Sequence, residues 1–454
     1  MSPVPPHFKP SPGRWFVAAA GTGLHLCLGT LYAWSFFQKP LVETYGWKNG
    51  EVAWAFSLAI LFLSTGAALG GILLPRVAPR ALAVSGALLF AAGHLLAALA
   101  VAWRSLPLLW IGYGVLGGLG AGLGYVVPVA TVARWFPDRK GLATGLVIMG
   151  FGLGALVASK ILAPVLMALG HGSLPFVFLG MGIFFLLVAL PLAMQMANPP
   201  GDTEGRRSWA DLPAEMRAAN ADIWSWRFAR MWAVFFCNIV AGIMFIGFQS
   251  PMLQELMRRA GSPLGAAQLA AAGATLIAFS SVCNGLGRFA WGAASDRFGR
   301  TNAFRAMLAL QAVIFFGLRF VESPALFSLL VCAVLLCYGG GFGVMPSFVM
   351  ETFGPRRMAE VYGAMLTAWG AGGVVGPQVA AWFKDHHPAD AASYAFLSGA
   401  LALTAGFIAS LTLRPPASCP TGLPVLPPSS ARPLQIALTP SPPSPTCRLP
   451  KTAG

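Results

Sequence analysis

The feature that most constrains this chain is its succession of long apolar runs. Runs of membrane-spanning length occupy residues 15–37, 51–74, 81–103, 107–131, 141–168, 174–196, 228–252, 267–291, 303–320, 324–348, 360–383 and 393–413. Helices that are apolar on all sides need either the core of a very large protein or a lipid environment. The sequence therefore predicts an all-α membrane protein with twelve transmembrane helices.

The charge content agrees with a membrane location. Charged residues make up 10% of the chain and hydrophobic residues 56%, whereas about 25% charged residues is typical of soluble domains. The net charge of +15 would suit nucleic acid only if the basic residues formed a patch, but they are dispersed over short turns. We therefore expect membrane lipid around the protein and no nucleic-acid partner.

A polar segment divides the runs into six and six. Residues 197–227 contain several acidic and basic side chains and predict a cytoplasmic linker that is partly helical. We expect an N-terminal six-helix bundle over 1–196 and a C-terminal six-helix bundle over 228–413. The tail over 414–454 is rich in Pro and Ser without a hydrophobic period, which is typical of a disordered segment.

The distribution of basic residues predicts the orientation. Most of the 30 lysines and arginines fall in the segments that include both termini and the linker. The opposite segments hold Lys39, Lys48, Arg104, Arg258, Arg259, Arg319 and Lys384. By the positive-inside rule, both termini are expected to be cytoplasmic in a multi-pass protein of the cell's inner (plasma) membrane.

The two halves repeat one another. The stretch from Gly71 to Arg76 precedes the third run as Gly292 to Arg297 precedes the ninth. A second pair of landmarks, Pro128 to Gly145 and Pro346 to Gly363, gives nearly the same shift. Parallel repeats of this kind predict two pseudo-symmetric bundles with a binding site between them.

One arginine lies inside the eighth run. Arg288 stands eight residues before Asp296, where a charged turn from Asp296 to Arg300 is expected to meet water. This separation is about 12 Å of helix, which places Arg288 near the middle of a hydrocarbon layer about 30 Å thick. Snorkelling to the interface is the alternative, but the intervening apolar and small residues oppose it. Because charges within spans are rare and mostly functional, we predict that Arg288 faces a cavity and binds substrate.

A short motif follows Arg288 and carries a family resemblance. It reads Gly292-x-x-x-Asp296-Arg297-x-Gly299-Arg300. With this motif, the chain resembles the major facilitator superfamily over nearly its whole length except the tail, which implies the major facilitator fold and a gating role for these five residues. The first-half copy is degraded, with Pro75 in place of the aspartate and Ala78 in place of a glycine.

Further motifs resemble one branch of that superfamily, the oxalate/formate antiporter family, which neighbours the monocarboxylate transporters. The motifs are Gly13-Arg14-Trp15-Phe16, Tyr32-Ala33-Trp34, Ala133 to Ala143, Gly150-Phe151-Gly152-Leu153-Gly154, Asn284-Gly285-x-x-Arg288, Met345-Pro346-Ser347 and Tyr362-Gly363. In that family the eighth-helix arginine binds the substrate carboxylate, so the resemblance assigns this role to Arg288.

One position departs from the family pattern. The resemblance implies a lysine on the eleventh helix, seven residues after Tyr362, but this chain has Trp369 there. Two cations suit a dianion and one suits a monoanion. We therefore expect monocarboxylates rather than oxalate.

Aromatic residues of two helices are further candidates for the substrate chamber. Tyr32 and Trp34 lie in the first run, and Tyr338 and Phe342 lie one turn apart in the tenth. The resemblance places helix-10 aromatics at the chamber, where they would exclude water and strengthen the hydrogen bonds of a carboxylate. Packing between helices is the alternative for all four, because aromatics are common in membrane spans.

Three polar residues within the runs have two interpretations each. Asn284 lies one turn before Arg288, where the related proton symporters carry an aspartate, and an amide cannot titrate. Lys160 could supply a second cation, but it lies near the outer end of its run and is expected to snorkel outward. His25 stands seven residues before Tyr32 on the same face; it is either proton-sensitive or, as favoured, bonded to a backbone carbonyl.

These features predict a secondary active transporter of small organic anions that works by alternating access, as a monomer. Exchange is favoured over proton symport, because no Asp or Glu lies deep in a run. The alternatives are a proton-coupled monocarboxylate symporter, a drug efflux pump and a non-transporting anion sensor. No metal-ligand spacing, nucleotide loop or nucleophile constellation is present in the sequence, so we expect no enzymatic activity, no cofactor and no metal.

Overall fold

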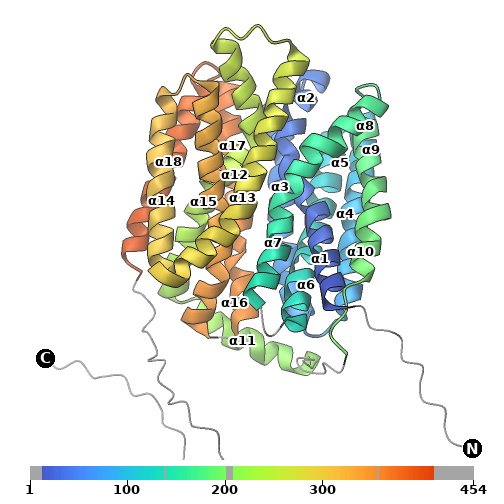
Figure 1. Ribbon diagram of the computed structural model, residues 1–454, viewed down its shortest axis with the longest axis vertical. Coiled ribbons are helices and arrows are strands. Elements are labelled where there is room, and N and C mark those ends of the chain that lie inside the picture. Colours follow the sequence, from blue (N-terminus) through green and yellow to red (C-terminus); the bar gives the residue numbers. More distant parts are fainter. Residues whose placement is uncertain (1–12, 137–139, 201–207, 355–356, 414–454) are drawn as a thin grey trace, which may run out of the picture. The chain divides into compact units, whose positions relative to one another are not determined.

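The apolar runs fold as helices. The computed structural model describes residues 13–136, 140–200, 208–354 and 357–413, and all regular elements in these ranges are helical (Figure 1). Eleven of them are long and apolar enough to cross a membrane. They coincide with eleven of the twelve expected runs, and the arrangement is that of the major facilitator fold.

Several spans of the first half are interrupted helices. The elements are α1 (Arg14–Gly29) and α2 (Trp34–Tyr45), α3 (Asn49–Leu73), α4 (Pro79–Ala102), α5 (Leu106–Leu109) and α6 (Gly118–Trp135), α7 (Lys140–Val157) and α8 (Ala163–Leu169), and α9 (Leu174–Phe184) and α10 (Leu190–Met194). Wider π turns join α7 to α8 and α9 to α10. Pro164 and Pro191 follow these turns, and proline cannot supply the N–H that a regular turn requires.

The second half has longer uninterrupted helices. After α11 (Leu212–Ile223) come α12 (Trp226–Arg259), α13 (Ala266–Phe298), α14 (Arg300–Gly317), α15 (Pro324–Phe353), α16 (Met358–Met365), α17 (Thr367–His386) and α18 (Ala391–Leu411). The expected linker is partly helical, since α11 lies within it.

The expected run over 360–383 is a helix in two pieces. It breaks at Leu366, whose carbonyl accepts a hydrogen bond of 2.9 Å from the Trp369 N–H. Pro377, Gln378 and a charged C-terminal turn lower its hydropathy, so it is not among the eleven long apolar helices. Nevertheless α17 packs against α3 and α12 and completes the bundle there.

The charged turn expected from Asp296 to Arg300 is much tighter than predicted, so that expectation was wrong. Helix α13 continues through Asp296 to Phe298, and Gly299 alone separates it from α14. Gly299 has a φ of 83°, a conformation that glycine adopts without strain. The glycine of the motif, rather than its aspartate, therefore ends the helix.

The break between α1 and α2 positions Tyr32. Residues Thr30–Ala33 form a 3₁₀ turn, and the Thr30 hydroxyl donates a hydrogen bond to the Cys27 carbonyl at 2.7 Å. The neighbouring Gly29 lies against the backbone of Phe151, where a Cβ atom would collide with the carbonyl. This close approach of α1 and α7 brings Tyr32 beside the helices of the second half.

Several helix pairs join the first half of the chain to the second, and three of them make the more extensive contacts. Helix α7 packs on α13, α3 on α17 and α2 on α12, and Figure 1 shows α7 beside α13. The described chain up to residue 413 belongs to one compact unit. The division into separate bundles over 1–196 and 228–413 therefore stays a prediction, and the tail over 414–454 lies outside the described residues.

The two ends of the helix bundle differ. The beginning of α1, helix α11 and the end of α18 lie at one end (Figure 1). At the other end, the Asp385 carboxylate accepts hydrogen bonds from the Asn49 N–H at 3.0 Å and the Gly50 N–H at 2.8 Å. A carboxylate at a helix N-terminus is favourable, so α17 caps α3 across the two halves.

Candidate functional site

Arg288 is buried without a counter-ion in the described chain. It lies on α13 and is 3% exposed. Its Nη1 donates to the Tyr125 hydroxyl at 3.4 Å, while Nε and Nη2 have no hydrogen-bond partner among the described residues. An uncompensated buried charge is costly. The guanidinium therefore presents two strong donors to whatever anion reaches it.

The local packing of α13 fixes the position of this arginine. Gly287 lies against the backbone of Leu336, and the backbone carbonyl of Arg288 lies against Gly343. Both contacts involve α15, and a side chain at either glycine would collide with them. The close packing of α13 on α15 therefore holds the backbone of Arg288, so its side chain turns towards the first half of the chain.

Aromatic rings from both halves surround the guanidinium. Its Cζ lies 4.9 Å from the ring centroid of Phe342 and 5.5 Å from that of Phe151. Such contacts are favourable for a cation. They still leave the N–H groups, which point outward in the plane of the guanidinium, available to an acceptor. The rings thus make a dry, partly compensating surround that does not neutralise the charge.

Tyr32, Tyr338 and Trp369 complete this surround. The hydroxyls of Tyr32 and Tyr338 are 2.7 Å apart and share a hydrogen bond between the halves. The Trp369 ring lies 4.8 Å from Phe342 and 5.6 Å from Tyr125, and it is fully buried. The predicted site residues Tyr32, Tyr338, Phe342 and Trp369 are therefore brought together with Arg288.

Asn284 borders the same region. It is 1% exposed, and its Oδ1 has no hydrogen-bond partner within the described ranges. It lines a small cavity together with Tyr32, Gln249 and Ser281. The Ser281 hydroxyl donates to the Gly152 carbonyl at 2.6 Å, which ties α13 to α7.

Two predicted residues do not join this cluster. Trp34 packs its ring 4.6 Å from Tyr113 and donates its indole N–H to Gln38 at 2.8 Å, within the first half. Lys160 is exposed and donates to the Thr275 hydroxyl at 2.6 Å. Thr275 lies thirteen residues before Arg288 on α13, which is about 20 Å of helix. Lys160 therefore does not supply a second cation beside Arg288.

Tyr125 and Phe151 both contact Arg288 but are not among the site residues predicted from the sequence. Phe151 lies within the Gly150 to Gly154 motif, whose sequence alone indicates no particular role. Tyr125 follows the glycine-rich part of α6. A tyrosine hydroxyl within an apolar run needs a polar partner, and that signal could have identified it.

The charged motif forms its own network at the end of α13 where α14 begins. Arg300 pairs with Asp296 at 2.6 Å and with Glu351 of α15 at 2.9 Å, and it also donates to the Ser295 hydroxyl. Arg297 is exposed, and Gly292 lies near the backbone of Gly343. The first-half copy has no aspartate, and its Arg76 instead pairs with Glu215 of α11.

His25 is held by two backbone carbonyls. Its Nδ1 lies 2.9 Å from the Val147 oxygen and its Nε2 lies 2.8 Å from the Tyr125 oxygen. Its ring stacks on Tyr125, with centroids 5.0 Å apart and planes 14° from parallel. His25 therefore lies directly behind a ring that contacts Arg288.

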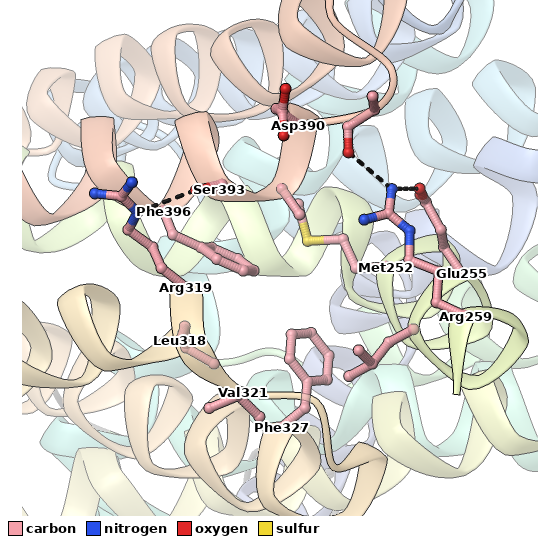
Figure 2. Close-up of a pocket in the computed structure, with 13 residues that line it drawn as sticks. Met252, Glu255, Arg259, Leu318, Arg319, Val321, Phe327, Asp390, Ser393 and Phe396 are labelled. Atoms are coloured by element: carbon pink, nitrogen blue, oxygen red, sulfur yellow. Dashed lines mark hydrogen bonds and ion pairs between the residues drawn. The ribbon is translucent and has the colours of Figure 1, made fainter. Parts of the chain in front are cut away.

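A second group of arginines lies around a pocket of about 300 Å³ between α12, α15 and α18 (Figure 2). Arg259 pairs with Glu255 at 2.5 Å and donates to the Ala389 carbonyl at 3.1 Å. Arg319 donates to the Ser393 hydroxyl at 3.0 Å. Figure 2 shows these contacts on the pocket wall, so both cations are engaged by the protein itself.

Comparisons with known proteins agree with this arrangement. The sequence profile of the Major Facilitator Superfamily matches residues 18–377 and 266–442. The chain is 26% identical to the oxalate:formate antiporter of Oxalobacter formigenes, over 82% of this chain and 86% of that protein. It is also 26% identical to the apicoplast pyruvate carrier 1 of Toxoplasma gondii, over 76% of this chain and 78% of that protein.

A human relative and two solved structures are further transporters to which the chain is similar. Monocarboxylate transporter 11 of Homo sapiens is 25% identical over 90% of this chain and 84% of its own length. The nucleoside transporter NupG superposes with a TM-score of 0.64 at 14% identity, covering 87% of this chain and 99% of that one. A bacterial homologue of the human lysosomal transporter Spinster superposes with a TM-score of 0.63 at 16% sequence identity, covering 89% of this chain and 97% of that one.

Proposed function

Because the chain belongs to the Major Facilitator Superfamily, we propose that this multi-pass membrane transporter carries small monocarboxylates, with Arg288 as the carboxylate anchor. It is a transporter and not an enzyme. Relatives named for oxalate and formate, for pyruvate and for monocarboxylates support an organic anion as the cargo. The single observation that carries the proposal is the buried Arg288 guanidinium, with two donor nitrogens, Nε and Nη2, that no described residue engages.

The chemistry of the site favours a carboxylate. A planar guanidinium offers paired donors in the geometry of a carboxylate. The surrounding rings of Phe151, Phe342 and Trp369 are apolar and buried, and charge-assisted hydrogen bonds are stronger in such surroundings than in water. A small anion bound to Arg288 would therefore recover the cost of burying that charge.

The charge count favours a monoanion over a dianion. Arg288 is the one basic residue that the described chain places in this cluster, since Lys160 is bonded to Thr275 far along α13. Trp369 occupies the position where the family resemblance implies a lysine. A dianion would leave one of its charges uncompensated among aromatic rings, which is costly.

Alternating access explains how the anion would cross. We expect the bundles over 1–196 and 228–413 to rock about the Arg288 site, with both termini in the cytoplasm and the protein working as a monomer in the plasma membrane. At one end of the bundle, Asp385 caps the N-terminus of α3. Opening towards that end has to break this cap and the hydrogen bond between Tyr32 and Tyr338.

Exchange follows from the same electrostatics. An anion that leaves Arg288 exposes an uncompensated charge in the core, and this raises the free energy of the empty carrier during reorientation. A second anion removes that cost. Exchange of one monocarboxylate for another is therefore the reaction that the site favours.

Counterflow in proteoliposomes tests the proposal. Vesicles containing the purified protein would be preloaded with unlabelled formate, oxalate, lactate or pyruvate, and entry of the labelled anion would be followed. We expect lactate, pyruvate or formate to exchange faster than oxalate. If none of the four anions exchanges above protein-free vesicles, the proposal is wrong.

A further inference from the structure

Each ring nitrogen of His25 faces a backbone carbonyl oxygen. A neutral imidazole cannot donate a hydrogen bond to both of these oxygens. A carbonyl oxygen only accepts, and His25 has one such oxygen within 2.9 Å of each ring nitrogen. A neutral imidazole has one N–H donor and one lone pair, whereas an imidazolium has two donors. Only the protonated ring can therefore donate to Val147 and to Tyr125 at the same time.

We propose that His25 is a proton-binding site whose occupancy is coupled to that of the anion at Arg288. This inference rests on the proposed function, because it needs an anion at Arg288, and it adds net proton-coupled uptake to exchange. It also assigns a role to the only histidine that the described chain places behind the Arg288 cluster.

The neutral form of His25 cannot keep the same contacts. Without the second proton, a nitrogen lone pair would face a carbonyl lone pair at less than 3 Å, as the two distances require. The side chain is fully buried, so a mismatched polar contact there is costly. The ring or one of the two helices must then shift, since Tyr125 belongs to α6 and Val147 to α7.

Few charged or titratable groups act on His25. Helix α6 presents Tyr125 and helix α13 presents Arg288, while α7 presents the Val147 carbonyl and the Phe151 ring. No described carboxylate pairs with the imidazole. The charge of Arg288 is therefore the principal charge that a proton on His25 would meet.

A layer of two rings connects the proton site to the anion site. Tyr125 stacks on His25 and accepts a hydrogen bond from Arg288. Phe151 contacts both, with its centroid 6.0 Å from that of His25 and 5.5 Å from the Arg288 Cζ. Both sites therefore share the same two neighbours.

Electrostatics then couples the two occupancies. Two positive charges separated by one ring layer repel each other strongly in a low-dielectric interior. A carboxylate on Arg288 cancels this repulsion and so favours a proton on His25. By thermodynamic reciprocity, a proton on His25 strengthens anion binding by the same factor.

The proton balance of the cycle is simple. One proton from the outer solution binds the free nitrogen of His25 when the anion binds, and both are released on the inner side. The empty carrier returns with a neutral His25. The charges of the transported anion and proton cancel, so the cycle moves no net charge. Net uptake of one anion therefore brings in one proton.

The experiment compares two transport modes of the full-length protein, with pyruvate as the probe. Counterflow of labelled pyruvate is measured at equal pH on both sides. Net uptake is measured under an inward proton gradient, with the membrane potential clamped and a pH-sensitive dye inside the vesicles. Protein-free vesicles correct for passive entry of the neutral acid.

We expect the wild type to accumulate pyruvate and to acidify the lumen in proportion. His25→Gln should lower gradient-driven uptake at least tenfold more than it lowers counterflow, and should remove the pH dependence of pyruvate binding. His94→Gln is the matched control, because His94 is also fully buried but has a single carbonyl partner, Phe90 at 2.9 Å. It should lower both modes by the same factor.

The outcomes separate this inference from the proposed function. Wild-type counterflow without gradient-driven uptake or acidification overturns the proton site and leaves the anion carrier standing. Equal losses in both modes for His25→Gln also overturn it. If the wild type shows no counterflow of formate, oxalate, lactate or pyruvate, the proposal that the protein is an anion carrier fails instead. The wild-type measurement decides the question even if His25→Gln does not fold.

Discussion

The Arg288 cluster and the pocket in Figure 2 both contain arginine, but they differ in what the arginine touches. Arg259 has a half-exposed side chain and an acidic partner in Glu255, and Arg319 has a hydroxyl partner. Arg288 is buried, has one long hydrogen bond to Tyr125 and retains two free donors in the described chain. The pocket is the roomier of the two places, yet its charges are already satisfied.

This difference shows that a hollow is a weaker sign of a binding site than an unsatisfied buried group. The polar groups around the pocket compete with any ligand for the same arginines. In the Arg288 cluster, an anion has no such competitor among the described residues. Substitutions at the two places should therefore have very different effects on transport.

The largest expected effect comes from Arg288→Gln. Removal of the guanidinium eliminates charge-assisted hydrogen bonds worth about 1.5–3 kcal/mol each, so counterflow should fall at least about 100-fold. Arg288→Lys keeps the charge without the planar pair of donors and should retain part of the activity. The measurement is pyruvate counterflow with equal amounts of reconstituted protein. Uptake by Arg288→Gln at half the wild-type rate would remove the difference between the two sites.

Trp369→Lys should change selectivity by about tenfold, which corresponds to about 1.4 kcal/mol. The substitution would give the cluster a second unpaired cation, and a dianion could then compensate both charges. The ratio of oxalate to pyruvate counterflow should rise. Trp369→Phe removes the indole N–H without adding charge and should leave that ratio near the wild-type value. An unchanged ratio in Trp369→Lys would show that charge count does not set selectivity.

Tyr125→Phe should have a moderate effect. The hydroxyl that accepts from Arg288 is lost while the ring remains, at a cost of about 1 kcal/mol, so half-saturation should require about five times more pyruvate. The maximal exchange rate should change less. Tyr113→Phe serves as the control, because Tyr113 is buried in the first half beside Trp34 rather than at Arg288. A similar affinity loss in both variants would argue against a role for Tyr125 in orienting the guanidinium.

Arg259→Gln should have the smallest effect. Exposed ion pairs contribute about 0–1 kcal/mol, and this one lies on the wall of the pocket in Figure 2. Counterflow should stay within about twofold of the wild type, with a small change in thermal stability. A loss as large as that of Arg288→Gln would mean that the pocket in Figure 2, too, is part of the transport path.

The fold was predictable to a large extent from the sequence. Eleven expected runs form helices long and apolar enough to cross a membrane, because the length of an apolar segment is a property of consecutive residues. The run over 360–383 was harder, since glycine, Pro377 and Gln378 interrupt its apolar character. The end of α13 was predicted too early, because Asp296 and Arg297 were read as a turn while Gly299 ends the helix.

The surroundings of Arg288 were only partly predictable. Tyr32, Tyr338, Phe342 and Trp369 lie beside it, whereas Trp34 packs within the first half and Lys160 bonds to Thr275. Tyr125 and Phe151 carried no spacing that related them to Arg288. Their contact depends on α6, α7 and α13 turning particular faces towards one another.

The sequence by itself determined that the chain spans a membrane repeatedly and that one arginine is held in the apolar part of its eighth run. Both follow from local properties, namely the hydropathy of consecutive residues and the cost of burying a charge. Only the tertiary structure decided that this arginine has no described counter-ion and that His25 meets two carbonyls behind it. Those facts depend on distances between helices far apart in the chain, and the close packing of Gly29 on Phe151 and of Gly152 on Gly285 helps to set those distances.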